Sequence, residues 1–307
     1  MTVARYPSTV MVSVVCPWDD AERLDEAVFR REIQHAVEAG FRHIYVFGTA
    51  GEGYAVDSAR FRHVIEVFGD ELAATEATPM VGVIGLSTAN VLERIAVAHA
   101  MGFREFQVSL PAWSVLSDDE VVTYLTTVCG AYPDSTFMHY NTARVGRVVD
   151  GALYRRLTDL IPNLVATKTM TADVGVVAGV VREAPELMHF LTEQTIATGA
   201  LHGEVALLGT FGGLAPAKSW ALLQAANAGR HHEAAEIGAW FARLNEVVLA
   251  PFMADRRVDG AYDKLIERLS PGLEDFPLRM LSPYRTISVE EAVEAARLLR
   301  EHFPDCA

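Results

Sequence analysis

Short apolar segments alternate with longer amphipathic segments along most of this chain, and this alternation limits the possible fold more than any other feature. The expected strands are Thr9–Cys16, His43–Thr49, Met80–Gly85, Glu105–Leu110, Thr136–Asn141, Leu164–Met170, Leu187–Glu193 and Val205–Gly212. The expected helices include Leu24–Ala39, Ser58–Phe68, Ala89–Met101, Asp118–Ala131, Gly151–Leu160, Asp173–Arg182 and Ala215–Asn227, and the segment after Glu193 is expected to hold a short one. Eight strands, each followed by a helix, are what a (β/α)8 TIM barrel requires.

An open, doubly wound sheet is the structural alternative to this barrel. Such a sheet that binds dinucleotides carries a glycine-rich turn after its first strand. The residues Cys16-Pro17-Trp18 follow the first expected strand here, and they hold no glycine. The sequence therefore favours the barrel.

The last quarter of the chain shows no strand pattern. Three helices are expected there, over His231–Ala254, Gly260–Leu269 and Val289–Phe303. We therefore expect residues 1–229 to form the barrel that carries the active site, and residues 230–307 to form a helical extension packed on it.

Composition excludes several classes of protein. The chain has 307 residues and a net charge of −14, which argues against a nucleic-acid surface, since such a surface needs a basic stripe. No apolar run reaches the ~18 residues of a transmembrane helix, and the N-terminus does not have the pattern of a signal peptide. The three cysteines lie far apart, and no cluster of His, Asp or Glu falls on neighbouring strand ends, which disfavours a zinc site or another metal site. We expect a cytoplasmic protein with no nucleic-acid or membrane partner.

Lys168 stands alone as a charged residue in the expected strand Leu164–Met170. A buried lysine costs free energy unless it is paired or neutral. The neutral amine is also the form that attacks a carbonyl to make an imine. The alternative is a structural lysine whose ammonium group reaches solvent or a carboxylate.

Strand alternation decides which side chains can meet Lys168. In a barrel, functional groups collect at the C-terminal ends of strands. If Lys168 points inward, Tyr140 on the preceding strand can point inward at a similar height, and His139 then faces the helices. We therefore expect Tyr140 to approach a substrate bound at Lys168, and His139 to be structural.

The segment Gly48–Gly53 follows the second strand and holds three glycines in six residues. Such a loop is either a tight turn or a set of exposed amides that bind a carboxylate. It lacks the Lys-Ser/Thr ending of a nucleotide-binding loop. A small anion is the ligand that this segment favours.

Taken together, Gly48-Thr49-Ala50-Gly51-Glu52-Gly53, Tyr140-Asn141 and Lys168 resemble, in order and spacing, the dihydrodipicolinate synthase / N-acetylneuraminate lyase superfamily. The resemblance covers nearly the whole chain. It implies a (β/α)8 barrel with a C-terminal helical extension, often a homotetramer, that acts as a class I aldolase or related lyase. It also implies a lysine Schiff base with pyruvate or another 2-oxo acid, and no cofactor besides this covalent imine.

The resemblance assigns roles residue by residue. It makes Lys168 the Schiff-base lysine, Tyr140 the general acid/base, and Thr49 the hydroxyl that relays protons to Tyr140. Gly48, Ala50 and Gly51 would form the pocket for the substrate carboxylate. Glu52 is expected to anchor its own loop instead of meeting substrate.

Several positions depart from the synthase pattern. Ala50 replaces a second hydroxyl, and Trp113, which stands where the synthases carry a tyrosine, is expected to contribute to substrate binding. Arg144 lies in a shortened loop and is either the arginine that binds the substrate carboxylate or part of a surface ion pair. Thr192, at the end of the seventh strand, and Gly209, at the end of the eighth, are expected to line the pocket, with Glu193 as a solvated carboxylate.

The leading hypothesis is a Schiff-base lyase, either an aldolase or a dehydratase, acting on pyruvate or a 2-oxo-3-deoxy acid. An authentic dihydrodipicolinate synthase is the alternative within this class, and the departures argue against it. A non-catalytic protein that binds a 2-oxo acid is the alternative from another class. The expected partners are a small-molecule substrate and further copies of the chain, as a homotetramer or dimer.

Overall fold

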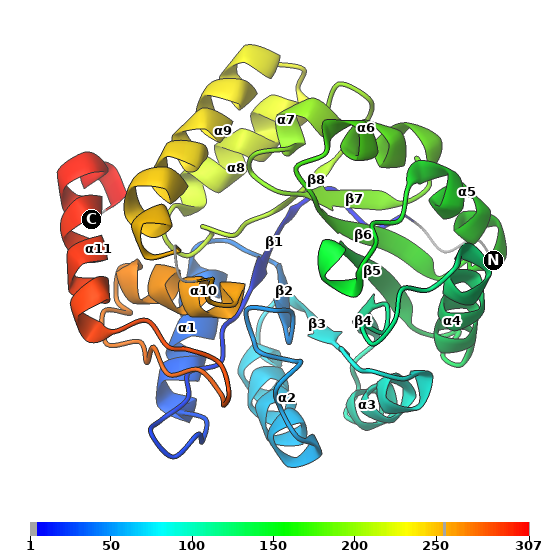
Figure 1. Ribbon diagram of the computed structural model, residues 1–307, viewed down its shortest axis with the longest axis horizontal. Helices are drawn as coiled ribbons and strands as arrows, with labels where there is room; N and C mark the ends of the chain where they lie inside the picture. Colours follow the sequence, from blue (N-terminus) through cyan, green and yellow to red (C-terminus); the bar gives the residue numbers. More distant parts are fainter. Residues whose placement is uncertain (1–4, 254–255, 307) are drawn as a thin grey trace.

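Eight parallel strands close into a barrel in the computed structural model, which describes residues 5–253 and 256–306. Each strand pairs with the next, and β8 pairs with β1 to close the ring (Figure 1). The strands are β1 Val10–Ser13, β2 His43–Val46, β3 Thr78–Gly82, β4 Glu105–Ser109, β5 Thr136–Thr142, β6 Leu164–Met170, β7 Met188–Leu191 and β8 Ala206–Leu208. The prediction of a (β/α)8 barrel is therefore confirmed.

A helix follows every strand and covers the outside of the barrel (Figure 1). These helices are α1 Glu26–Glu38, α2 Ser58–Leu72, α3 Thr88–Ala100, α4 Asp118–Gly130, α5 Gly151–Leu160, α6 Val174–Glu183, α7 Ile196–Gly199 and α8 Pro216–Asn227. Asp or Ser side chains cap the N-termini of α1 to α6 and satisfy amides that have no partner within the helix. Local sequence thus fixes where most helices begin. The short helix expected after Glu193 is a single turn, α7.

Several strands are shorter than their apolar patterns predict. The pattern Val205–Gly212 predicts eight residues of strand, but β8 has three. β7 likewise ends at Leu191, before Thr192 and Glu193. After these residues the backbone no longer pairs with a neighbouring strand. The loops that follow border the open end of the barrel.

The barrel interior is filled by side chains and is not a channel. Its buried apolar cluster contains four methionines together with aromatic and aliphatic residues. Tyr6 belongs to this cluster, and its hydroxyl donates a hydrogen bond of 2.5 Å to Glu105, the first residue of β4. The packed interior forms the floor on which the open end of the barrel rests.

The register of β5 and β6 places Tyr140 beside Lys168. A bulge interrupts this pairing: Phe137 pairs with Leu164 and Met138 pairs with Ala166, so Val165 is an extra residue. Both Val165 and Ala166 belong to the interior cluster. From Ala166 onward the strand alternates regularly, and Lys168 points inward as predicted.

The helical segment after β8 departs from the sequence prediction at one place. The expected helix His231–Ala254 is divided into α9 His231–Leu244, a π-helical turn at Asn245–Leu249 and a 3-10 turn at Ala250–Phe252, while Ala254 lies outside the described residues. Pro251 explains the division, because proline has no amide hydrogen with which to continue an α-helix. Two further helices follow, α10 Asp259–Leu269 and α11 Val289–His302.

Helix α10 lies inside the ring of outer helices, beside the open end of the barrel, and α11 lies at the outer edge (Figure 1). Within residues 5–253 and 256–306, no helix is long and apolar enough to span a membrane. The division of the chain into units at 1–229 and 230–307 stays a prediction.

A buried ion pair joins α10 to the loop after β2. Lys264 lies 2.9 Å from Glu52, and both side chains are 0% exposed. Glu52 also accepts hydrogen bonds of 2.7 Å from the indole of Trp18 and from the amide of Leu281, and Lys264 donates to the carbonyl of Cys16. Glu52 therefore anchors its loop, as predicted, and it does so by binding three distant segments at once.

Removing one partner of this pair should destabilise the protein strongly. Glu52→Gln or Lys264→Met leaves a buried charge unpaired, and we expect the free energy of unfolding to fall by about 3–5 kcal/mol, measured by urea denaturation. As a control, Glu301→Gln breaks an exposed pair with Arg297 and should leave the urea midpoint close to that of the unaltered protein. Unaltered midpoints for both core variants would contradict this role.

Candidate active site

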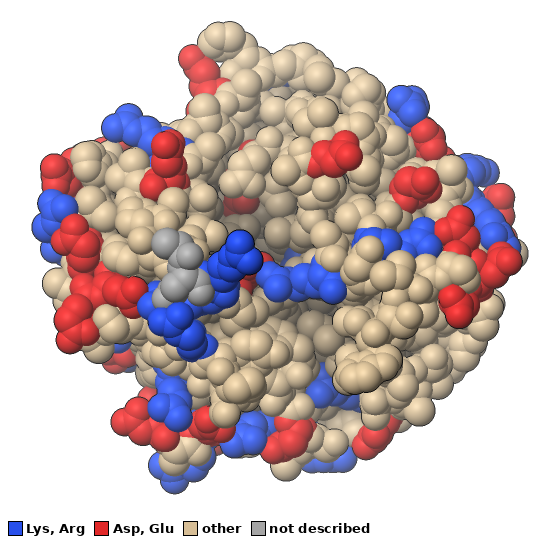
Figure 2. Space-filling model, in the orientation of Figure 1, with Lys and Arg blue, Asp and Glu red and all other residues tan. Residues whose placement is uncertain are grey.

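A cavity of about 210 Å³ opens at the C-terminal ends of the barrel strands. Residues at the ends of β1, β2, β5, β6, β7 and β8 line it, and α10 closes one side. Figure 2 shows the hollow at the centre of this face, with basic side chains grouped along its rim beside and over α10. The cavity therefore lies where active sites of (β/α)8 barrels form.

Lys168 lies inside this cavity and is 3% exposed. Its Nζ donates a hydrogen bond of 2.5 Å to the hydroxyl of Tyr45 on β2 and lies 4.1 Å from the ring centroid of Tyr140. Burial lowers the pKa of Lys168, because the ammonium form loses its water, while negative charge on nearby groups opposes the shift only partly. This environment favours the neutral amine.

The three predicted catalytic residues lie together. Tyr140 is buried, and its hydroxyl lies 3.2 Å from the hydroxyl of Thr49, close enough for a hydrogen bond. Both residues line the same cavity as Lys168. A phenol, a second hydroxyl and an amine are thus arranged so that protons can move between them and a bound molecule.

The glycine-rich loop is divided between cavity and core. Ala50 lines the cavity with Thr49, whereas Gly48 and Gly51 lie behind it, outside the residues that line it. A Cβ at Gly48 would lie 2.7 Å from the Tyr45 ring, and one at Gly51 would lie 2.7 Å from the backbone nitrogen of Phe47. These two glycines make room for tightly packed neighbours, including the tyrosine that contacts Lys168.

Two candidate substrate-binding residues, Trp113 and Arg144, are not among the residues that line the cavity. Trp113 is 87% exposed, because the loop after β4 carries it to the surface, so it does not line the cavity of this chain, and its expected role in substrate binding stays a prediction. Arg144 forms an ion pair with Asp259 of α10. Asp259 lines the cavity, so this pair lies at its edge, and the ion-pair alternative for Arg144 matches the structure.

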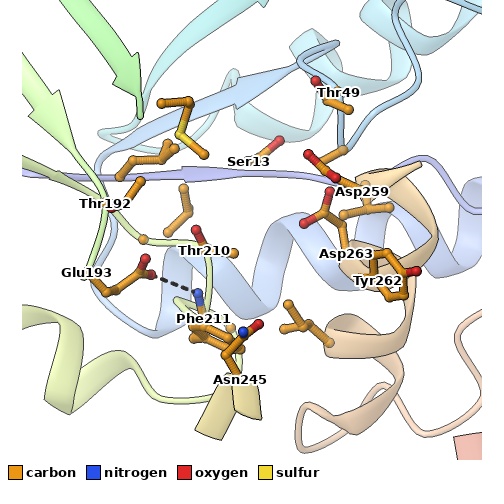
Figure 3. A pocket seen from close by; sticks show the side chains of 18 of the residues that line it. Ser13, Thr49, Thr192, Glu193, Thr210, Phe211, Asn245, Asp259, Tyr262 and Asp263 are labelled. Carbon is orange, nitrogen blue, oxygen red and sulfur yellow. Dashed lines mark hydrogen bonds between the residues drawn. The ribbon is translucent and has the colours of Figure 1, made fainter. Parts of the chain in front are cut away.

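Three residues after β7 and β8 line the cavity, and for one of them the structure differs from the prediction. Thr192 and Gly209 line the cavity. Glu193 lines it as well, but it is buried, and it accepts a hydrogen bond of 3.2 Å from the amide of Phe211 (Figure 3). The expectation of a solvated Glu193 is therefore wrong, because the loop after β8 folds over this carboxyl group.

His139 and its neighbours lie outside the barrel, as alternation predicted. The Nδ1 atom of His139 lies 2.6 Å from the hydroxyl of Tyr154 on α5. On β7, the Nδ1 atom of His189 lies 2.8 Å from the hydroxyl of Thr167. Burial lowers the pKa of His139 to about 3 and that of His189 to about 4, so both are neutral and structural.

Sequence reasoning missed two features of the site. Tyr45 was not identified, although alternation along β2 would have paired it with the inward face of the barrel. Asp259, Asp263 and Glu267 also line the cavity from α10. Their spacing of four residues puts them on one face of a helix, which was a readable signal in the predicted C-terminal extension.

The carboxyl groups in the cavity hold their protons unusually tightly. Burial raises the pKa of Glu193 and that of Asp263 to about 7, and the negative charge of Asp259 adds to the shift at Asp263. Burial also raises the pKa of Glu267, which lies beside Asp263. Near neutral pH these groups are therefore only partly ionised. Across the described residues, no group of three or more His, Cys, Asp or Glu side chains is arranged to hold a metal ion.

Comparison with known proteins gives one family and one fold. A model of the dihydrodipicolinate synthetase family matches residues 6–259. An N-acetylneuraminate lyase from Escherichia coli is 24% identical over 196 residues, which cover 63% of this chain and 65% of that enzyme. The chain therefore spans just under two thirds of the length of the curated relatives that it matches.

Solved structures show the same fold at low sequence identity. The crystal structure of YagE, an Escherichia coli prophage protein of the dihydrodipicolinic acid synthase family in complex with pyruvate, superposes with a TM-score of 0.83 at 18% identity, over 96% of this chain and 98% of that one. N-acetylneuraminate lyase of Proteus mirabilis superposes with a TM-score of 0.81 at 20% identity, over 97% of this chain and 98% of that one. Both confirm the barrel with its C-terminal helices.

The raised pKa of Asp263 makes stability depend on pH. Above about pH 4, Asp263 ionises in the unfolded chain but keeps its proton in the folded one up to about pH 7, so its contribution to stability is present at low pH and is lost as the pH rises through this window. Asn at this position does not ionise. We therefore expect Asp263→Asn to gain about 1–3 kcal/mol in free energy of unfolding, relative to the unaltered protein, between pH 4 and pH 7.5.

Denaturant unfolding across this pH range measures the difference. Asp275→Asn serves as a control, because a hydrogen bond from Arg31 lowers the pKa of Asp275, so this variant should show no such gain between pH 4 and pH 7.5. If the free energy of unfolding of Asp263→Asn differs from that of the unaltered protein by the same amount at every pH, the Asp263 carboxyl group titrates normally in the folded protein.

Proposed function

The chain belongs to the dihydrodipicolinate synthetase family, as its motifs indicated, and on this premise we propose that it is a lyase that forms a Schiff base between Lys168 and a 2-oxo acid. The substrate would be pyruvate or a 2-oxo-3-deoxy acid, and the reaction an aldol cleavage or a dehydration. No cofactor is needed beyond the covalent imine.

The observation that carries this proposal is the environment of Lys168. Its amine lies in a cavity, is almost fully buried and has a lowered pKa, and its hydrogen-bond partner is a phenol, not a carboxylate that would hold it as an ammonium ion. A structural lysine at this depth would need a paired anion. A nucleophilic lysine needs the neutral form that this site favours.

The proposed first step joins the amine to the substrate. The lone pair of Lys168 attacks the C2 carbonyl carbon, and the carbonyl oxygen takes a proton to give a carbinolamine. Tyr140, which shares a hydrogen bond with Thr49, then donates a proton to the departing hydroxyl, and water leaves as the protonated imine forms. The same phenol can recover its proton through Thr49 or solvent.

The second step uses the imine as an electron sink. In aldol cleavage, a base takes the proton of the C4 hydroxyl, the C3–C4 bond breaks, and its electron pair moves into the imine, giving an enamine and an aldehyde. In dehydration, the imine first loses a C3 proton, and the resulting enamine expels the C4 hydroxyl. After cleavage, the enamine takes a proton at C3 and becomes an imine again. In both reactions, hydrolysis of the imine then releases the product and restores the amine.

Several features support a 2-oxo acid as the substrate. The basic side chains at the rim of the hollow in Figure 2 would attract an anion towards the cavity. Thr49 and Ala50 line the cavity near Tyr140 and could receive its carboxylate. Relatives carry the names of enzymes that cleave such acids, and the related YagE structure contains pyruvate.

We further propose that the chain forms a homo-oligomer. Three large apolar side chains, Leu86, Val115 and Trp113, are exposed in the loops that follow β3 and β4. Burial of these side chains against another copy would remove apolar surface from water. Sedimentation measurements would give the number of copies.

Borohydride trapping tests the proposed nucleophile. The chain has only three lysines, at 168, 218 and 264, which makes the product simple to map by mass spectrometry. With pyruvate and borohydride we expect one stable adduct, on Lys168, and none in Lys168→Ala. Lys218→Ala is the control and should keep the adduct. An unmodified Lys168 with pyruvate and with a panel of longer 2-oxo acids would falsify the proposal.

Exchange of the pyruvate methyl hydrogens in D2O tests the role of Tyr140 without knowledge of the second substrate. The enamine takes up deuterium at C3, so NMR reports each passage through it. Tyr140→Phe should slow this exchange by about 10² to 10⁴-fold, since it removes the proposed acid/base group. Tyr284→Phe alters a tyrosine that is exposed at the surface and should exchange at the normal rate. Equal rates for all three proteins would remove Tyr140 from the mechanism.

A further inference from the structure

A row of carboxyl groups on α10 forms one wall of the cavity. Asp259, Asp263 and Glu267 are spaced four residues apart and all line the cavity. Figure 3 shows Asp259 and Asp263 projecting from this helix towards the space, opposite Thr192 and Glu193. Like charges at this spacing weaken a helix, so helix formation alone does not account for the row.

The inner carboxyl groups of this wall, Asp263 and Glu267, accept no hydrogen bond from a residue that the structure describes. Glu267 is only 8% exposed, yet none of the described residues gives a hydrogen bond or an ion pair to its side chain or to that of Asp263. Burial of a carboxyl group without a partner costs free energy. An unsatisfied acid that points into a cavity therefore indicates a ligand that supplies the missing partner.

The charge balance of the cavity indicates what kind of partner this is. Four carboxyl groups line it, and Lys168 is the one cationic side chain among its described lining residues. Asp259 is already paired with Arg144, whereas Glu193, Asp263 and Glu267 form no ion pair with a described residue, although the charges of Lys168 and Arg144 act on Asp263. A ligand with only hydroxyl groups would not need these acids, because its hydroxyls could donate to neutral acceptors in the cavity, such as the side chains of Thr210 and Asn245. Three acids that form no ion pair with a described residue favour a ligand with a positive charge.

We propose that Asp263 and Glu267 of this wall, together with Glu193 on the opposite side, bind an ammonium group, so that the portion of the substrate beyond the reacting carbonyl carries a primary amine. This inference rests on the Schiff-base function proposed above, and it adds the class of substrate. Lys168 holds the 2-oxo end, and the acidic wall selects for an amine and against a second carboxylate at the other end. A divalent metal ion is a poorer occupant, since these residues are not arranged to hold one.

The protonation of the wall agrees with this assignment. Glu32 of α1 faces Glu267, and Glu193, Asp259, Lys168 and Arg144 face Asp263, so the wall carries several acids and little positive charge. Burial and mutual repulsion raise the pKa values of Asp263 and Glu267. A bound cation stabilises the ionised forms, and its binding should therefore release protons near neutral pH.

Three probes with the same carbon chain and different charges test the inference directly. They are 3-amino-1-propanol, 1,3-propanediol and 3-hydroxypropanoate, titrated into the full-length protein by calorimetry at pH 7.5 and constant ionic strength. We expect the cation to bind at least tenfold more tightly than the diol, and the anion to bind most weakly. Repetition in two buffers of different ionisation enthalpy should show proton release with the cation.

Variants assign the preference to the wall. Asp263→Asn and Glu267→Gln should each weaken binding of the cation at least fivefold and narrow its advantage over the diol. Glu66→Gln, which alters an exposed glutamate on α2, is the matched control and should keep the advantage. The comparison of three probes on the unaltered protein decides the matter even if a variant fails to fold. Equal binding of the diol, or tighter binding of the anion, would overturn the inference.

Trapping with pyruvate and borohydride on the same preparation separates the two proposals. An adduct on Lys168 without any preference for the cation overturns the ammonium wall and leaves the Schiff-base function standing. A preference for the cation, with no adduct from pyruvate or from the panel of longer 2-oxo acids, supports the wall as a binding site and overturns the Schiff-base function.

Discussion

The buried pair of Glu52 and Lys264 is the contact on which the site depends. Glu52 lies in the loop that also carries Thr49 and Ala50, and Lys264 lies on the helix that carries Asp259, Asp263 and Glu267. With Trp18 and Leu281 also bound to Glu52, four segments meet at two charges. Such a pair is stable only when both partners are held in place, so the loop that carries Thr49 and the helix that carries the acidic wall are fixed relative to each other by one interaction.

The two ends of the cavity differ in polarity. Its floor is the apolar barrel interior, which removes water from Lys168 and lowers the pKa of its amine. The opposite wall gathers acids that burial keeps partly protonated and that have few hydrogen-bond donors around them. Under the two proposals made above, the ligand would join an electrophilic carbonyl to an ammonium group, and neither end alone would define the substrate.

The sequence predicted the parts of this arrangement that follow from local periodicity. All eight strands, the inward direction of Lys168, its neighbour Tyr140 and the outward direction of His139 follow from alternation and chain order. The contribution of α10 could not be derived in this way, because the position of a helix beyond the barrel depends on long-range contacts such as Lys264 with Glu52. The same limit applies to Trp113, which motif position placed near substrate and loop geometry carries outward.

The rarity of lysine in this chain bears on chemical selectivity. Only three of its 26 basic residues are lysines; Lys168 lies in the cavity, Lys264 is buried against Glu52, and Lys218 stacks over the ring of Trp240. Arginine keeps its charge and does not form imines under ordinary conditions. If the proposed Schiff-base function holds, a carbonyl substrate would meet few competing lysine amines on this protein, because arginine supplies most of its positive charge.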